Sequence, residues 1–232
     1  MPELVVVVPS RGRPEQAHSL LVAFKATCTA NTELVFALDD NDPTADDYPG
    51  AACVFTSPSR NMVEALNNAV AYFTDDRVIG GRPFAVGFMG DDHRPRSRAW
   101  DQAYLDALRE LGAGIVYGND LLQGERLATQ CAMTSDIVRA LGYMAPPTLT
   151  HLWVDNYWMF IGSGADCLRY LPEVIVEHMH PLAGKANWDA DYARVNDPAM
   201  YARDEAAFRA YAGSGELSED IAKVRALRAA HV

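Results

Sequence analysis

The sequence has few cysteines and no long apolar run, and both shortages narrow the class of protein. Its four cysteines are Cys28, Cys53, Cys131 and Cys167, and no CxxC pair occurs among them. In a chain of 232 residues this favours reduced thiols in a cytosol-like compartment over a disulfide framework, so we expect a cytoplasmic protein. No apolar run approaches the ~18 residues of a membrane span, and the opening MPELVVVVPS lacks the basic residues of a signal peptide. We therefore expect no membrane partner.

Positive charge is also scarce. The chain has 20 lysines and arginines against 31 acidic residues, and its formal net charge is −11. A protein with this balance does not bind nucleic acid through bulk electrostatics, so any contact with a polyanion has to be local. The one dense basic cluster is Arg94, Arg96 and Arg98.

The first half of the chain alternates strand-like and helix-like segments. Strands are expected at 3–10, 33–42, 51–57, 83–92 and 112–120, where apolar or β-branched runs end in polar residues. Helices are expected between them, at 13–27 with Pro14 in the first turn, after Ser59 as N-cap and after Ser97 as N-cap. This alternation predicts an α/β fold with an open, mostly parallel sheet and helices on both faces.

The second half follows a different pattern. It predicts helices at 133–142 and 154–168, a proline-rich loop at 143–153 and an amphipathic helical tail from about Pro198. The segment EVIVEHMHP, at 173–181, predicts a strand by its strict alternation.

Polar side chains gather where the predicted strands of the first half end. They are Ser10 and Arg11, Asp39 and Asp40, Ser59 and Arg60, and Asp91 and Asp92. Carboxyl ends of parallel strands share one edge of the sheet, and in open α/β sheets ligands bind there.

Asp91 and Asp92 are the members of this set with the most specific chemistry. Two adjacent carboxylates at a strand end repel each other, and Mg²⁺ or Mn²⁺ would remove that cost. Gly90 permits close approach of the backbone to a ligand. The alternative is a solvated acidic turn, since Asp-Asp pairs are common in loops.

Four segments in order, VVVVPSRGRP, ALDDND, SRNMVEALNNAV and GFMGDDH, resemble the GT-A fold of nucleotide-sugar glycosyltransferases, near the family 2 type. The resemblance implies a Rossmann-like sheet with a C-terminal acceptor-side elaboration and a helical tail. It divides a single domain into a nucleotide-sugar-binding half, 1–120, and an acceptor-binding half, 121–232. The DDH takes the place of the DxD metal motif, with His93 where that motif has its second aspartate.

The resemblance also implies roles for individual residues. Asp92 would bind Mn²⁺ or Mg²⁺, Asp91 would contact ribose or metal, and His93 would either bind metal or orient the turn. The residues expected to bind the donor are Pro9, Ser10, Arg11, Arg13, Asp39, Asp40, Arg60, Asn61, Asp91 and Lys185.

Two histidines of the second half are candidate metal ligands. In the predicted strand, Val174, Val176, His178 and His180 share one face. Enzymes of the GT-A type often complete the metal shell with a histidine from the C-terminal half, which implies that His178 or His180 has this role. The sequence does not separate the two.

The segment that contains HLWVDNYW resembles the acceptor region of the same enzymes, where an acid opens a helix. That acid is Asp155, and the resemblance implies an inverting transfer in which its carboxylate deprotonates the acceptor hydroxyl. The alternative is an acid that the helix dipole favours in a first turn. His151 and Trp153 are expected on the acceptor side, with Arg94 and Arg96 serving acceptor backbone or donor phosphate.

The chain resembles small phage-encoded enzymes that modify DNA, which implies a UDP-sugar donor, a hydroxymethylated pyrimidine such as 5-hydroxymethylcytosine as acceptor, and residence in the host cytoplasm. A saccharide or small polyol is the next acceptor. A nucleotidyltransferase is less favoured, because PSRGRPEQ has only one glycine where such enzymes carry a glycine-rich signature. A non-catalytic nucleotide-sugar binding protein is the remaining alternative.

Overall fold

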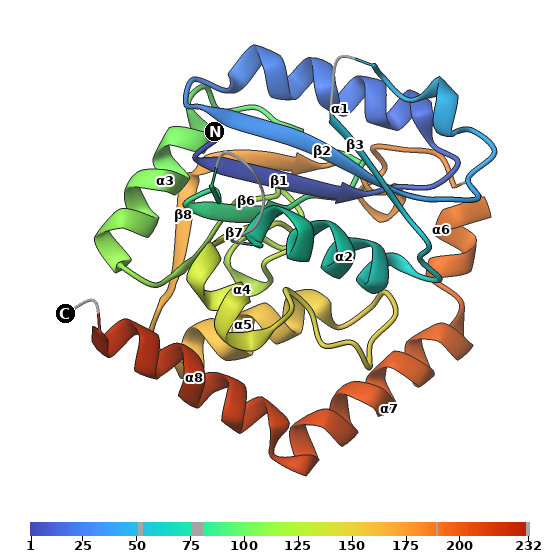
Figure 1. Cartoon of the computed structure of the whole chain (residues 1–232). Coiled ribbons are helices and arrows are strands. Elements are labelled where there is room, and N and C mark those ends of the chain that lie inside the picture. Colours follow the sequence, from blue (N-terminus) through green and yellow to red (C-terminus); the bar gives the residue numbers. More distant parts are fainter. Residues whose placement is uncertain (51–52, 76–80, 189, 231–232) are drawn as a thin grey trace.

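A run of four valines forms the centre of the sheet. β1 (Leu4–Pro9) is buried on both faces. It pairs in parallel with β2 (Thr32–Asp39) and β4 (Ala85–Phe88), and β2 pairs in parallel with β3 (Cys53–Ser57). The computed structural model describes residues 1–50, 53–75, 81–188 and 190–230 (Figure 1). The parallel half predicted from the strand-helix alternation is confirmed.

Beyond β4 the sheet becomes mixed. It continues through β7 (Cys131–Thr134), β6 (Ile115–Asn119), β8 (Leu168–His178) and β5 (His93–Pro95), in the order β3-β2-β1-β4-β7-β6-β8-β5. β7 is antiparallel to both β4 and β6, and β5 is antiparallel to β8. The short strands β5 and β7 were not predicted, because three or four residues carry too little periodicity to be recognised.

Helices cover both faces of the sheet, as the alternation predicted. α1 (Pro14–Thr27) and α3 (Trp100–Leu111) cover one face, on which Val6, Val8 and Phe36 pack against Leu20 and Trp100. Since successive strand residues point to opposite faces, Val5 and Val7 belong to the core on the other side.

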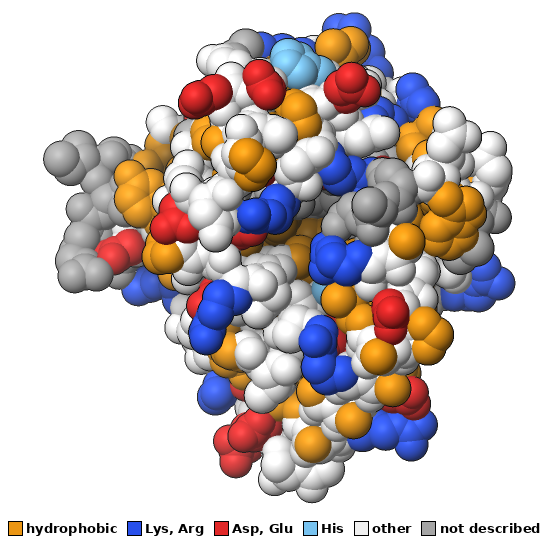
Figure 2. Space-filling view, turned by 90° about the vertical axis from the view of Figure 1, so that its right-hand side faces the viewer, with side chains coloured by type: hydrophobic (Ala, Val, Ile, Leu, Met, Phe, Trp, Pro, Cys, Tyr) orange, Lys and Arg blue, Asp and Glu red, His pale blue; other side chains and the backbone are white. Residues whose placement is uncertain are grey.

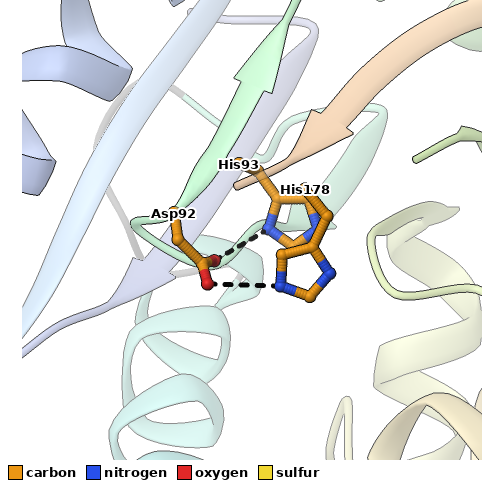
Figure 3. Close-up of side chains that lie close together, drawn as sticks. All are labelled: Asp92, His93 and His178. Carbon is orange, nitrogen blue, oxygen red and sulfur yellow. Dashed lines mark hydrogen bonds and ion pairs between the residues drawn. The ribbon is translucent and has the colours of Figure 1, made fainter. Parts of the chain in front are cut away.

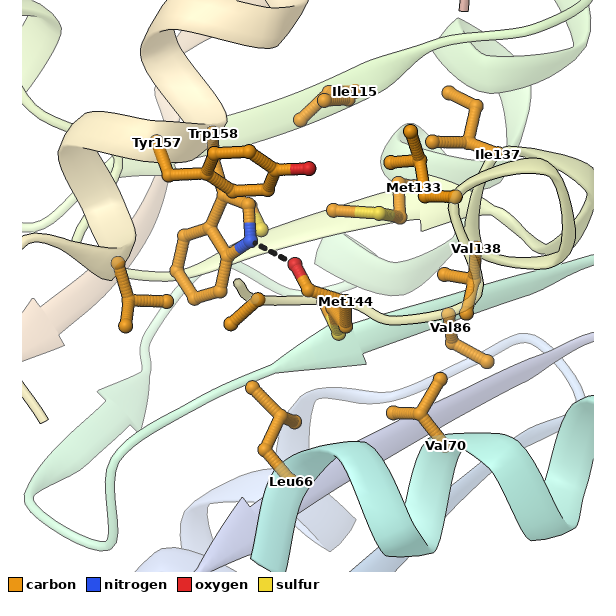
Figure 4. Packing of buried hydrophobic residues seen from close by; sticks show 14 of the residues in the cluster. Leu66, Val70, Val86, Ile115, Met133, Ile137, Val138, Met144, Tyr157 and Trp158 are labelled. Carbon is orange, nitrogen blue, oxygen red and sulfur yellow. Dashed lines mark hydrogen bonds between the residues drawn. The ribbon is translucent and has the colours of Figure 1, made fainter. Parts of the chain in front are cut away.

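The second face carries the larger core. α2 (Met62–Thr74), α4 (Ser135–Leu141), α5 (Val154–Gly164), α7 (Pro198–Ser214) and α8 (Glu216–Ala230) contribute to it. Figure 4 shows Leu66 and Val70 of α2 facing this core, and the indole of Trp158, whose Nε1 donates to the carbonyl of Met144 at 2.9 Å. The helical second half is therefore part of the same core as the sheet.

Two helices begin later than predicted. The N-cap of α2 is Asn61, whose side-chain oxygen accepts from the backbone N–H of Glu64, while the Ser59 hydroxyl bonds that of Ser57. α3 follows Ala99, and the Ser97 hydroxyl instead bonds the backbone of β8 by donating to Glu173. Both serines were wrong as caps, because their hydroxyls bond other groups: Ser59 bonds Ser57, and Ser97 bonds Glu173, which is far away in the sequence.

The C-terminal segment also differs from its predicted boundaries. The predicted strand at 173–181 belongs to the longer β8, which ends at His178 and so leaves His180 outside it. After it come the short turns of η3 (Pro181–Ala183) and α6 (Ala190–Val195), and α7 begins at Pro198, where the helical tail was predicted. Two further short turns lie in the connections, η1 (Ala45–Asp47) and η2 (Gly124–Arg126). Among the described residues, no helix is long and apolar enough to cross a membrane.

Leu66 tests the contribution of the second core. Its side chain is fully buried, so we expect Leu66→Ala to lower the free energy of unfolding by about 2 to 5 kcal/mol, through lost apolar burial and the cavity left behind. Urea denaturation measures the change. Val22→Ala, at a site 70% exposed, is the control and should change it by no more than about 0.5 kcal/mol. Equal effects of the two substitutions would contradict the assignment of this core.

Candidate functional site

Asp91 is buried between groups from the first strand and the first helix. Because β1 and β4 are parallel neighbours, Ser10 lies beside Asp91 and donates to its Oδ2 at 2.6 Å. Ser10 also bonds the hydroxyl of Tyr48 at 2.8 Å, and Arg13 Nε lies 3.4 Å from Asp91 Oδ1. Burial acts to lower the pKa of Arg13, but Asp91 and Tyr192 raise it above its ordinary value. The negative charge of Asp91 is thus already balanced by Arg13 and by the hydrogen bond from Ser10.

Asp92 forms a compact cluster with two histidines (Figure 3). One ligand atom each of Asp92, His93 and His178 lies within 4.8 Å of the others. Asp92 Oδ2 is 3.2 Å from His178 Nε2, and Asp92 Oδ1 is 3.5 Å from His93 Nδ1. The antiparallel register of β5 and β8 places His93 directly opposite His178, and the two rings stack at 4.4 Å. Residues far apart in the sequence are therefore brought together by strand pairing.

His93 supports the turn as well as the cluster. Its Nδ1 accepts the backbone N–H of Gly90 at 3.0 Å, so the free proton of the neutral ring belongs on Nε2. His93 is 2% exposed, and its Nε2 has no hydrogen-bond partner in the described part of the chain. The sequence left two roles open for His93, metal binding or orientation of the turn. Its hydrogen bond to Gly90 supports the second role.

Gly90 is required by the close packing of this turn. A Cβ at position 90 would lie 2.7 Å from Asp92 Oδ1 and 3.1 Å from His93 Nδ1, well inside van der Waals contact. The glycine expected to permit a close backbone approach therefore makes room for the cluster's own side chains.

The electrostatics of the cluster favour positive charge beside Asp92. Burial would lower the pKa of His178, but Asp120 and Asp92 raise it to about 9. Burial would raise the pKa of Asp92, yet His178 and His93 hold it well below its ordinary value. The pKa of His93 is lowered by burial and by the charge of His178. The two carboxylates of Asp92 and Asp120 therefore stabilise one positive charge between them, at the position of the His178 ring.

A divalent cation fits the donor set of this cluster. A carboxylate oxygen and an imidazole nitrogen 3.2 Å apart are the mixed ligands that Mn²⁺ accepts. The buried His178 Nδ1 and His93 Nε2 have no hydrogen-bond partner among the described residues, which is rare for buried polar atoms. His180 lies just outside, its ring 5.1 Å from that of His178, so the structure separates the two candidate histidines that the sequence did not.

α6 contacts the cluster through Tyr192. The Tyr192 hydroxyl donates to Asp92 Oδ2 at 2.8 Å, and the Arg13 guanidinium lies over the Tyr192 ring at 4.6 Å. Nothing in the sequence marked Tyr192, because it lies between the predicted strand 173–181 and the predicted helical tail from Pro198, where no element was expected. The C-terminal segment thus contacts both acidic residues of the turn, one directly and one through Arg13.

The predicted donor-side residues divide into two groups. Arg11 donates to Asp39 at 2.8 Å and to Asn41 at 2.6 Å beside the end of β1, where Pro9 is the last strand residue and Asp40 is exposed. Arg60 and Asn61 have other partners: the exposed Arg60 pairs with Glu64, and Asn61 caps α2. The structure therefore does not bring those two side chains into the Asp91–Asp92 cluster.

The basic cluster after the turn is not a uniform anion-binding patch. Arg94 is buried, and its guanidinium donates to the carbonyls of Asp91 and His93 and to the Gln16 side chain, which does not agree with a role in binding acceptor or phosphate. Arg96 is exposed but donates to Glu177 at 2.8 Å.

Lys185 shares the partner of Arg96. Its ammonium lies 2.8 Å from the other carboxylate oxygen of Glu177, and Arg98 is exposed. Arg96 and Lys185, which were predicted to meet a phosphate or an acceptor backbone, therefore both pair with the carboxylate of Glu177.

Asp155 opens α5, and its carboxyl interacts with the charges of His178 and Asp120. It lies in the first turn of the helix and is half-buried. Burial raises its pKa; the charge of His178 lowers it and that of Asp120 raises it. A carboxylate whose proton affinity is raised next to the cluster is suited to accept a proton.

Asp204 of α7 fixes the loop before α5 through hydrogen bonds. This fully buried carboxylate accepts the Thr150 hydroxyl and the backbone N–H groups of His151 and Leu152. Trp153 follows in the left-handed region at φ +68° and stacks on Phe208 at 5.5 Å, so its ring belongs to the core. That placement does not agree with a direct acceptor contact for Trp153.

Sequence reasoning missed three residues of this region: Asp120, Tyr192 and Asp204. Asp120 ends the predicted strand 112–120, which is the same signal that selected Asp39 and Asp91, so it could have been found. Tyr192 and Asp204 carried no signal, because both act through contacts over long sequence separation.

Comparison with known proteins establishes the fold. No protein-family model matches the sequence, and no curated protein matches it. Solved structures do match. One is the mannosyltransferase PcManGT from Pyrobaculum calidifontis in complex with GDP-Man and Mn²⁺, with a TM-score of 0.57, 14% identity, and coverage of 97% of this chain and 80% of that one.

Two further structures agree. Glucosyl-3-phosphoglycerate synthase from Mycobacterium tuberculosis, in complex with Mn²⁺, UDP-Glc and glycerol 3-phosphate, has a TM-score of 0.62, 14% identity, and coverage of 91% of this chain and 80% of that one. S. aureus TarS has a TM-score of 0.57 and 11% identity over 76% of this chain. The chain spans 36% of TarS and 59% of its 1–349 fragment. The chain therefore has the GT-A fold expected from its sequence.

Gly90 tests the packing of the turn. We expect Gly90→Ala to lower the free energy of unfolding by about 1 to 3 kcal/mol, because the added methyl group displaces the Asp92 carboxylate. Gly213→Ala in α7 is the matched control: its methyl group meets nothing within 4 Å, so it should stabilise by about 0.5 to 1 kcal/mol. Urea denaturation of both variants measures the two changes, and a neutral Gly90→Ala would refute the tight turn.

Proposed function

We propose that this chain is a metal-dependent glycosyltransferase that moves a sugar from a nucleotide sugar, most readily a UDP-sugar, to an acceptor hydroxyl. The observation that carries the proposal is the contact of Asp92 with His178 at the carboxyl edge of a GT-A sheet. The glucosyl-3-phosphoglycerate synthase structure, which shares this fold, is a complex with Mn²⁺ and UDP-Glc, and it supports the choice of metal and donor.

Asp92 and the Nε2 of His178 are the residues proposed to hold the ion, with Asp91 turned toward Ser10 and Arg13. Their mixed oxygen and nitrogen donors favour Mn²⁺ over Mg²⁺. When bound, the ion would neutralise the charge that develops on the nucleoside diphosphate leaving group. His180 would lie outside the coordinating set.

The donor would bind along the ends of β1 and β2. Arg13 is oriented by Asp91 and the Tyr192 ring, so its position is fixed before a diphosphate arrives. Pro9, Arg11, Asp39 and Asp40 line the neighbouring strand ends and are proposed to contact base and ribose. Figure 2, which looks onto the side toward which β1 and β2 run in Figure 1, shows lysine and arginine side chains around a hollow in the surface.

Asp155 is proposed as the base of an inverting transfer. An alcohol is a weak nucleophile, and a carboxylate that takes its proton as the new C–O bond forms typically contributes about 10² to 10⁴ in rate. Burial raises the pKa of Asp155 and so increases its affinity for a proton, while the nearby charge of His178 favours its ionised form. His151, in the loop that Asp204 holds, is proposed to line the acceptor side.

For the acceptor, the local charges favour a hydroxyl of a saccharide or small polyol. Arg94 is buried, and Arg96 and Lys185 share Glu177, so the basic groups proposed to meet a DNA backbone are largely engaged. The net charge of −11 acts in the same direction. Hydroxymethylated DNA, the acceptor implied by the sequence resemblance, is the second candidate and is tested in parallel.

Release of nucleoside diphosphate tests the reaction class. With Mn²⁺, we expect release from a UDP-sugar among a panel of nucleotide sugars, with transfer to saccharide acceptors; a chelator should abolish it and excess Mn²⁺ should restore it. Release of pyrophosphate from a sugar phosphate and a nucleoside triphosphate would instead identify a nucleotidyltransferase. If no donor is consumed with any acceptor, including hydroxymethylated DNA, the chain is not a glycosyltransferase for these substrates.

Asp155→Asn tests the base. We expect transfer to fall by about 10² to 10⁴ because the amide cannot take the proton, while binding of UDP and Mn²⁺ is retained. Asp136→Asn, in the first turn of α4, is the matched control and should leave transfer unchanged. Full turnover by Asp155→Asn would rule out this base, and donor binding without turnover in the unsubstituted protein would identify a binding module.

A further inference from the structure

The contact of His178 with Asp92 does not show which nitrogen of the His178 ring carries the proton when a metal is bound. A neutral imidazole has one N–H and one lone pair, so Nε2 can bind a metal only if the proton is on Nδ1. In metal sites the second ring nitrogen usually donates to a carboxylate or carbonyl, which fixes both the tautomer and the ring. The group that faces Nδ1 of His178 therefore decides whether Nε2 is available.

Asp120 is the charged group at that position. Its Oδ2 lies 3.9 Å from His178 Nδ1, an ion-pair distance longer than a hydrogen bond, and Nδ1 is buried without a hydrogen-bond partner among the described residues. The backbone joins the same two residues, since the N–H of His178 donates to the carbonyl of Asp120 at 3.0 Å. His178 thus lies between two carboxylates, with Asp92 on Nε2 and Asp120 on Nδ1.

The carboxylate of Asp120 is itself fixed. Its side chain is 1% exposed, and Oδ1 accepts the backbone N–H groups of residues 122–124 at 2.7 to 3.0 Å. Oδ2 accepts the Thr129 hydroxyl at 2.9 Å and keeps further acceptor capacity toward the ring. Four donors hold the group in its ionised form and prevent it from turning away.

We propose that Asp120 is a positioning residue for the metal site: its carboxylate keeps a proton of His178 on Nδ1, so that Nε2, which faces Asp92 at 3.2 Å, can give up its own proton and turn its lone pair to an ion bound between the two residues. This inference rests on the metal site of the proposed function, but it concerns a residue outside the coordinating set. Its alternative is that Asp120 only caps the turn at 122–124.

Asp101 shows what a capping role alone looks like. It is also fully buried, accepts the backbone N–H groups of Thr29 and Ala30 and takes the Thr32 hydroxyl. These contacts involve no histidine, and they lie at the start of β2, at the opposite edge of the sheet from the cluster. Asp101→Asn is therefore a matched control for Asp120→Asn.

Binding of Mn²⁺ alone, followed by electron paramagnetic resonance of the free ion, is the first test. In Asp120→Asn the amide oxygen can still accept from residues 122–124, but its NH₂ group then faces the ring. A donor opposite Nδ1 favours the proton on Nε2, so we expect the Kd for Mn²⁺ to rise about 10- to 100-fold. Asp101→Asn should bind within about twofold of the unsubstituted protein. An unchanged Kd in Asp120→Asn, or an equal loss in both variants, would overturn the positioning role.

The histidine tautomer gives a second test that needs no variant. In protein labelled with ¹⁵N-histidine and loaded with Zn²⁺ as a diamagnetic ion, we expect His178 to carry its proton on Nδ1; a proton on Nε2 would overturn the inference even if Asp120→Asn does not fold. The two proposals fail differently. If the unsubstituted protein binds no Mn²⁺, the metal site itself fails; if it binds Mn²⁺ and Asp120→Asn binds equally well, only the role of Asp120 fails.

Discussion

The structure depends on compensating the negative charge buried at the end of β4. Asp91 and Asp92 are 6% and 8% exposed, and burying two adjacent ionised carboxylates without partners would cost an amount comparable with the whole stability of a domain. Apart from the adjacent His93, the charged partners are distant in the sequence: Arg13 lies at the start of α1, and His178 at the end of β8. The pairing of β5 with β8 satisfies this constraint, because it places His178 opposite the residue that follows Asp92.

The C-terminal segment completes the region at two points. Tyr192 of α6 donates to Asp92, and Asp204 of α7 holds the loop that leads to Asp155. A single stretch of chain therefore contacts the candidate metal position and supports the candidate base. A change in the position of this segment would alter the proposed donor and acceptor sides together, since α6 and α7 are separated by only two residues.

Several site residues could be predicted because a local signal marked them. Asp91 and Asp92 follow a buried strand, and the parallel sheet predicted their place at its carboxyl edge beside Ser10. His178 and His180 were both predicted as candidate ligands by strand alternation, and β8 ends at the first of them. Arg60, Arg94 and Trp153 have partners that the sequence did not indicate, namely Glu64, backbone carbonyls of the turn and Phe208, because a sequence pattern does not show which polar or aromatic group is already engaged.

By itself the sequence determined the alternation of strands and helices in the first half, the parallel half of the sheet and the acidic turn at its edge, because hydrophobic periodicity and strand-end polarity are local properties. The tertiary structure alone decided the antiparallel strands β5 and β7, the position of His178 opposite His93, and the contacts of Asp120, Tyr192 and Asp204. These depend on pairing between residues far apart in the chain, and on buried charges that must find partners wherever the fold supplies them.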